Sequence, residues 1–79
     1  MATIPHWDER AVLTSDLEMV ERHVLEGRRH VHRQNEILAR LEELGADSNM
    51  AAQLLIQFEV TLAEHEAHRD RIRIALGLN

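Results

Sequence analysis

The sequence has no cysteine, no tyrosine and no lysine, and Trp7 and Phe58 are its only aromatic residues. Without cysteine, the chain can form neither disulfides nor thiolate metal sites, which excludes the cysteine-based zinc modules. Proteins that bind single-stranded nucleic acid stack bases on aromatic side chains, and so little aromatic material excludes such a surface. β-branched residues are also too few to build a sheet. These absences leave a small helical protein as the expectation.

Charge and hydropathy exclude two further classes of protein. The formal net charge is −5 over 79 residues, which argues against a general nucleic-acid binder. No apolar run approaches the length that spans a membrane, and residues 1–10, MATIPHWDER, lack the apolar segment of a secretory signal. We therefore expect a cytoplasmic protein that binds neither nucleic acid nor membrane.

Helix-forming residues dominate what is present, mainly alanine, leucine, glutamate and arginine. The one clear interruption is ELGADSNMA, where Gly45 suits a left-handed helix end and Asp47 or Ser48 can cap the next helix. The final LGLN repeats the glycine stop. The first helix could begin near Trp7 or near Ser15, which opens a stretch with capping-box spacing. We predict a single domain over residues 1–79, with helices at about 8–44 and 49–76 and a turn at 45–48.

Apolar residues recur at alternating intervals of four and three along both predicted helices, which is the pattern of a coiled-coil seam. Because a short turn joins two long helices, they should lie antiparallel as an all-α helical hairpin. The seam positions are Leu13, Leu17, Val20, Val24, Gly27, Val31, Gln34, Leu38 and Leu41 in the first helix, and Ala51, Leu55, Phe58, Leu62, His65, Arg69, Ile72 and Leu76 in the second.

Four of these seam positions are not large apolar residues. Gly27, Gln34, His65 and Arg69 interrupt the seam in its middle. We therefore expect the half of the hairpin next to the turn to be the more stable one, and both chain ends to fray. A residue without a side chain complements bulky neighbours, so Gly27 should face the turn of helix that carries His65 and Arg69.

The charged residues beside the seam support the same pairing. In antiparallel helices, the residues that flank the seam on one helix meet their counterparts on the other. The basic stretch GRRHVHR then lies beside an acidic stretch of the second helix. This favours a structural role over a nucleic-acid surface at Arg28, Arg29 and Arg33. The predicted contacts are Glu21 with Arg73, Arg28 with Glu66, and Asn35 with Glu59.

Apolar residues outside the seam indicate self-association. Each Leu- or Ile-sized side chain left in water forfeits ~1.5–3 kcal/mol of burial free energy. We predict a homodimer of hairpins that forms a four-helix bundle, with another protein as a further possible partner. The alternative is a monomer whose apolar residues are shielded by neighbouring arginine and glutamate stems. The predicted interface consists of Ile56, Val60, Ala63, Ala67 and Ile74 on the second helix and of Met19, Leu25, Ile37 and Leu44 on the first.

Six histidines are the unusual feature of the composition. His65 and His68 share one helix, and His23 is predicted to reach the same level of the other. Clustered imidazoles bind Zn²⁺, Ni²⁺ or Cu²⁺, with Glu26 or Glu64 as further ligands. They can also sense pH, with His23 and His68 repelling each other once both are protonated. The spacing matches no recognised ligand motif, so we predict no metal, with His23, His65 and His68 as the candidates. Solvated helix-face histidines are the simpler interpretation.

The sequence offers no catalytic constellation. Serine and threonine occur in no context that would activate a nucleophile, and no Gly-rich phosphate loop is present. A hairpin also encloses no pocket that would exclude water. We expect a protein that is not an enzyme and that binds no cofactor.

The run GRRHVHRQNEILARLEELGADSNMAAQLLIQFEVTLAEHEAHRDRI resembles short uncharacterised helical-hairpin proteins of α-proteobacteria. The shared features are Gly-Arg-Arg, Arg-Gln, Leu-x-x-x-Gly and Leu-Leu-x-x-Phe-Glu-x-x-Leu. The resemblance implies a bacterial origin and a helical fold, and that family has no assigned function. The leading hypothesis is a self-associating protein–protein interaction module. The alternative is a histidine-dependent metal or pH sensor on the same scaffold.

Overall fold

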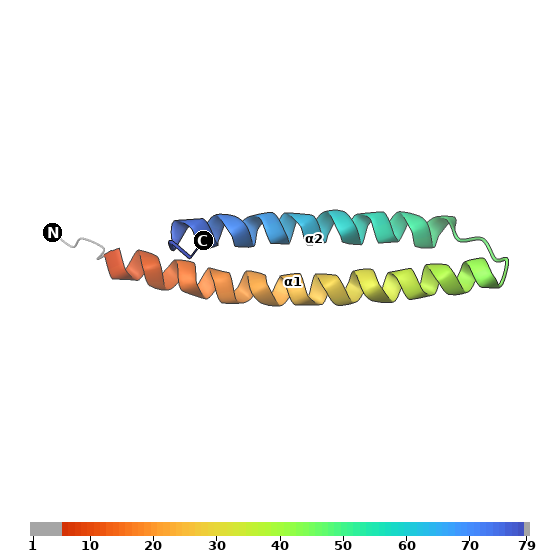
Figure 1. The fold of residues 1–79 in the computed structure, drawn as a ribbon, viewed down its shortest axis with the longest axis horizontal. Helices are drawn as coiled ribbons and strands as arrows, with labels where there is room; N and C mark the ends of the chain where they lie inside the picture. The colour runs from red at the N-terminus through yellow and green to blue at the C-terminus, as the bar shows by residue number, and fades with distance from the viewer. Residues whose placement is uncertain (1–5, 79) are drawn as a thin grey trace.

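The chain folds into an antiparallel pair of helices. The computed structural model describes residues 6–78, with side chains from Glu9 onward. Within this range, α1 spans His6–Glu43 and α2 spans Asn49–Ala75 (Figure 1). The two helices lie side by side along their length, which confirms the predicted all-α hairpin. Residues 1–5 and 79 of the predicted domain lie outside the described range, as does the side chain of Trp7.

The N-terminal end of α1 resolves the ambiguity in the sequence. α1 begins at His6, so a helix start at Ser15 is wrong. The Thr14 hydroxyl donates a hydrogen bond to the Arg10 carbonyl at 2.9 Å, which is the bond of a residue inside a helix and not of a cap. Because α1 has 38 residues and α2 has 27, the first turns of α1 extend past the end of α2 (Figure 1).

Both helices end in the same glycine motif. Gly45 and Gly77 adopt φ angles of 66° and 73°, which a residue without a Cβ adopts without strain. The amide after Gly45 donates to the Leu41 carbonyl, and the amide after Gly77 donates to the Arg73 carbonyl, both at 2.9 Å. Each of these hydrogen bonds joins an amide to the carbonyl five residues earlier, which defines a Schellman motif that ends the helix.

The cap of α2 is formed by one of the two predicted residues. The Asn49 amide donates to the Asp47 carboxylate at 3.0 Å. Ser48 precedes the helix but makes no side-chain capping hydrogen bond. Asp47 therefore satisfies one of the free amides at the start of α2.

Every predicted seam position is buried or half-buried, so the seam is confirmed residue by residue. We expected the half next to the turn to be the more stable one, but the buried apolar cluster of the described chain lies at the other end. Residues next to the turn, such as Leu38 and Phe58, are only half-buried, because two helices alone cannot cover them. At the end of the hairpin opposite the turn, called the open end below, the first turns of α1 extend past α2 and cover its last turn. There the Arg10 guanidinium donates to the Leu76 carbonyl at 3.3 Å. The buried cluster at this end consists of Leu17, Val20, Ile72 and Leu76, with Leu13 packed against it.

Gly27 faces Leu62, and not the His65–Arg69 turn as predicted. A Cβ on Gly27 would lie 3.1 Å from the Leu62 Cδ1. The ion pair between Arg28 and Glu66 lies one turn beyond this layer along α2. Long side chains lean toward the N-terminus of their own helix, so they meet partners past the level of their own Cα.

Gln34 is the buried polar residue of the seam. It is 6% exposed, and its Nε2 donates to the Ala51 carbonyl at 3.0 Å. This bond connects the second half of α1 to the first turn of α2. It satisfies the amide group and ties the two helices together in one register.

Candidate functional site

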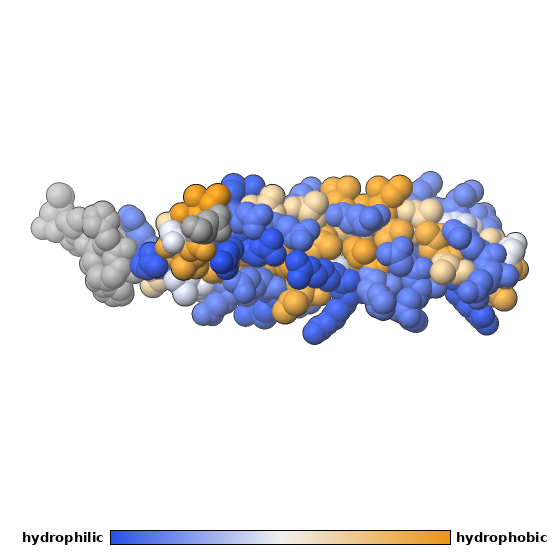
Figure 2. Space-filling model, viewed as in Figure 1, coloured by the Kyte–Doolittle hydropathy of each residue, from blue (hydrophilic) through white to orange (hydrophobic). Residues whose placement is uncertain are grey.

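The predicted interface residues of α2 form one exposed stripe along α2, which is interrupted once by Asp70. It is called the α2 stripe below and consists of Ile56, Val60, Ala63, Ala67 and Ile74. Ile56, Val60 and Ile74 keep 60%, 53% and 63% of their surface exposed, and both alanines are exposed. Their spacing keeps them on one side of the helix. In the space-filling view, hydrophobic side chains recur along the edge of the molecule that α2 forms (Figure 2). The hairpin leaves this side of α2 without a packing partner.

The predicted interface residues of α1 do not form a comparable stripe. Met19, Leu25 and Leu44 are exposed, whereas Ile37 is half-buried and is partly used inside the hairpin. Leu25 lines a groove beside α2, so it is the α1 residue that can extend the α2 stripe. The prediction also missed four exposed apolar residues, although each is a large apolar residue outside the seam and could have been counted. They are Val12, Met50, Leu54 and Leu78.

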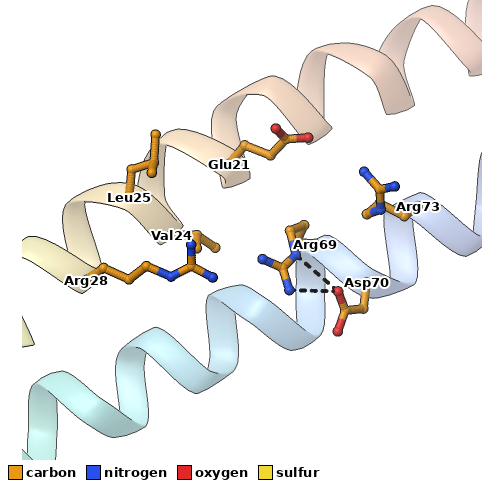
Figure 3. A pocket seen from close by; sticks show the side chains of 7 residues that line it. All are labelled: Glu21, Val24, Leu25, Arg28, Arg69, Asp70 and Arg73. Carbon is orange, nitrogen blue, oxygen red and sulfur yellow. Dashed lines mark hydrogen bonds and ion pairs between the residues drawn. The ribbon is translucent and has the colours of Figure 1, made fainter. Parts of the chain in front are cut away.

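The groove beside Leu25 has a volume of about 320 Å³ and lies between the two helices (Figure 3). Val24 and Leu25 are its apolar lining residues, both on α1. Its polar walls carry guanidinium and carboxylate groups from both helices, and Arg69 pairs with Asp70 at 3.0 Å across its rim. A groove with this lining accepts an aliphatic side chain that is flanked by charges. It is lined by Glu21, Val24, Leu25, Arg28, Arg69, Asp70 and Arg73.

One of the two predicted ion pairs across the hairpin is confirmed. The Arg28 Nη2 lies 3.4 Å from the Glu66 carboxylate. Both side chains are partly exposed, so the pair contributes only about 0.2–1 kcal/mol and mainly selects the register. Arg29 and Arg33 are exposed. The basic stretch is thus partly neutralised by α2.

The other two predicted contacts across the hairpin are wrong. Glu21 and Arg73 line the same groove but form no ion pair, because Arg73 donates instead to the Leu78 carbonyl at 3.1 Å. The Schellman motif after Gly77 brings this carbonyl back over the last turn. Asn35 donates to the Val31 carbonyl of its own helix at 3.1 Å, so it does not bind Glu59.

The structure brings two of the three candidate metal ligands together. The ring centroids of His23 and His65 lie 4.9 Å apart. His68 is exposed and does not line the hollow that His23 and His65 share. His30, which the prediction did not single out, stacks on Phe58 with centroids 5.3 Å apart. Within residues whose side chains are described, no group of three or more histidine or carboxylate side chains is arranged to hold a metal ion.

Hydropathy along the described helices gives no candidate membrane span. Sequence and fold comparisons identify no relative from which a function could be carried over. No protein-family model, curated protein or solved structure matches this chain.

Proposed function

We propose that this protein is a non-enzymatic, self-associating interaction module of the cytoplasm, in which two hairpins pack through their α2 stripes into a four-helix bundle. The observation that carries the proposal is the exposure of the α2 stripe over five turns of helix. No element of the described chain covers it. A second copy of the same stripe is the most economical cover, since a two-fold contact uses one surface twice.

The energetics of the hairpin support the proposal. A chain of this size buries only about 60% of its unfolded surface, so its stability as a monomer is marginal. Ile56, Val60 and Ile74 keep 53–63% of their surface exposed, so covering each one adds roughly half of the ~1.5–3 kcal/mol that full burial contributes. Over both copies, that gain is comparable to the whole stability expected of a small domain.

Thermal melting at several protein concentrations tests the proposal, because only an associating protein has a concentration-dependent Tm. The Val60→Glu variant should remove this dependence by placing a charge in the α2 stripe. Val12→Glu is the matched control: it makes the same change at a residue that is 60% exposed, against 53% for Val60, and lies on α1 away from the stripe. It should melt with the same concentration dependence as the unchanged chain. If both variants behave alike, the stripe is not the association surface.

A second candidate function, a pH-responsive hairpin, is favoured by the His23–His65 contact. Imidazoles gain a proton between about pH 5 and 8, and two cationic rings this close repel each other. The nearby groups that share their hollow are Glu26 and His30, and Arg69 follows His65 by one turn. The Glu26 carboxylate offsets part of the repulsion. The histidine variants described in the Discussion test this candidate.

A further inference from the structure

We infer that the second copy docks on the α2 stripe in one antiparallel register, with Ala63 facing the partner's Ala67 and Ile56 facing the partner's Ile74. This inference rests on the proposed self-association and adds its geometry. It follows from the spacing of the α2 stripe, from the charges beside it, and from the pairing rule that the hairpin itself displays.

The α2 stripe is a second seam. Ile56, Val60, Ala63 and Ala67 follow one another at intervals of four, three and four, as the residues of the hairpin seam do. A seam of this type packs against another helix in layers. We place the two-fold axis at the midpoint between Ala63 and Ala67. An antiparallel second copy then packs its Ala67 against Ala63 of the first. The two large isoleucines then meet at either end of the contact.

Asp70 is the one polar residue of this second seam, and its ion pair with Arg69 reduces the cost of placing a carboxylate there. In the inferred register it faces the partner's Val60. Asp70 is already paired with Arg69 at 3.0 Å, so its charge is not left without a partner. Asp70 lines the same groove as Val24 and Leu25, and this groove can receive the side chain of the partner's valine.

The hairpin shows how flanking charges pair relative to a seam layer. Gly27 and Leu62 form one layer, and the ion pair beside it joins Arg28, one residue after Gly27, to Glu66, four residues after Leu62. Side chains that lean toward their own N-terminus produce this offset in antiparallel helices. The same offset applied to the α2 stripe identifies which flanking residues of two copies would meet.

Charges beside the α2 stripe are complementary in the inferred register. One residue after Ala63 and four residues after Ala67, Glu64 meets the partner's Arg71. The two-fold axis repeats this contact, so two attractive contacts flank the apolar layers. Glu66 lies near the two-fold axis, so it approaches the partner's Glu66 and the two carboxylates repel each other. Arg28 lies 3.4 Å from Glu66 in its own chain and offsets this repulsion.

Other registers bring like charges together. A shift of one heptad toward the start of α2 sets Glu59 against the partner's Glu66. The opposite shift sets Arg71 against the partner's Arg71, and leaves Ile56 and Val60 without partners. A parallel arrangement sets Glu59 against the partner's Glu64. Charge and apolar contact therefore favour the same register.

Engineered cysteines test the register directly, because the chain has no cysteine of its own. Disulfides form only where the Cα atoms approach within about 7 Å. Ala63→Cys and Ala67→Cys chains are prepared separately, mixed and oxidised mildly, and the cross-linked fraction is measured on a denaturing gel. The register control is a mixture of Val60→Cys and Ala63→Cys, whose cysteines face each other only after the shift of one heptad. The first mixture should cross-link several-fold more than the second, and more than either variant alone.

Charge exchange supplies a second readout. Glu64→Arg should weaken self-association about 3- to 10-fold, and adding Arg71→Glu in the same chain should restore it. A dimer by sedimentation that cross-links mainly through Val60→Cys and Ala63→Cys, or through neither mixture, overturns the register while the proposed function stands. A chain that sediments as a monomer overturns the proposed function, and the register fails with it.

Discussion

Gly27 of α1 packs directly on Leu62 of α2, with only 3.1 Å between the position of a Cβ on Gly27 and the Leu62 Cδ1. Glycine inside a helix costs about 1 kcal/mol relative to alanine, because it loses more backbone freedom on folding. At this position the missing side chain lets the two helices approach in the middle of the hairpin. The atom nearest to the missing Cβ is the end of a flexible side chain, so it can move.

The Gly27–Leu62 contact leads to a prediction for three variants. Gly27→Ala should change the free energy of unfolding by less than about 0.5 kcal/mol, since the gain in helix propensity is offset by displacement of Leu62. Gly27→Leu should destabilise by about 1–3 kcal/mol, because the helices must separate. In a Leu62→Ala background, Gly27→Ala should become stabilising by about 1 kcal/mol. Urea unfolding of the unchanged chain, the Leu62→Ala chain and the three variants measures these differences. Equal effects of Gly27→Ala in both backgrounds would show that the contact does not matter.

Gln34 provides a second prediction. Gln34→Ala should lower the free energy of unfolding by about 1–2 kcal/mol, because it removes the hydrogen bond to the Ala51 carbonyl and leaves a void. Gln34→Leu should stay within about 1 kcal/mol of the unchanged chain, since it restores the volume and the carbonyl still accepts a bond within α2. Chemical unfolding followed by circular dichroism compares the two. A leucine variant as unstable as the alanine variant would assign the whole effect to the hydrogen bond.

The two predicted ion pairs should differ in a double-mutant cycle. Alanine substitution of Arg28 and Glu66, singly and together, should give a coupling energy of about 0.2–1 kcal/mol that disappears in 1 M salt. The same cycle for Glu21 and Arg73 should give a coupling near zero, because Arg73 binds the Leu78 carbonyl instead. The second cycle is the control for the first. A larger coupling for Glu21 and Arg73 would mean that the end of the chain is not held as described.

Acidification should destabilise the hairpin through His23 and His65. Two protonated imidazoles whose ring centroids lie 4.9 Å apart repel each other. His23→Gln should therefore lose less in Tm between neutral and acidic buffer than the unchanged chain. His32→Gln is the control, because His32 lies 3.6 Å from the Glu36 carboxylate and not against a second imidazole. If both variants show the same change in Tm as the unchanged chain, the contact does not respond to pH.

The repeat of apolar residues was sufficient to predict the fold. Alternating intervals of four and three, together with Gly45 and Asp47, gave the antiparallel hairpin and its turn, because helix periodicity and glycine conformation are local properties. The half-buried state of Arg69 and His65 also follows from the repeat. The pattern of apolar residues likewise identified the exposed members of the α2 stripe.

The sequence did not predict where the hairpin packs best. Burial at the open end depends on the overhang of α1 and on the Arg10–Leu76 contact, which joins residues from opposite ends of the chain. The sequence also did not predict which of several hydrogen-bond partners a polar side chain would bind. Asn35 and Arg73 have backbone carbonyls within reach, and a heptad pattern does not include them.

The central claim is that the α2 stripe joins two copies of this chain. Sedimentation equilibrium of the unchanged protein over a hundredfold range of concentration tests it most directly. We expect a mass that rises toward twice that of the chain, with Val12→Glu following the same curve and Val60→Glu remaining at the mass of one chain. A single-chain mass for the unchanged protein at every concentration would contradict it.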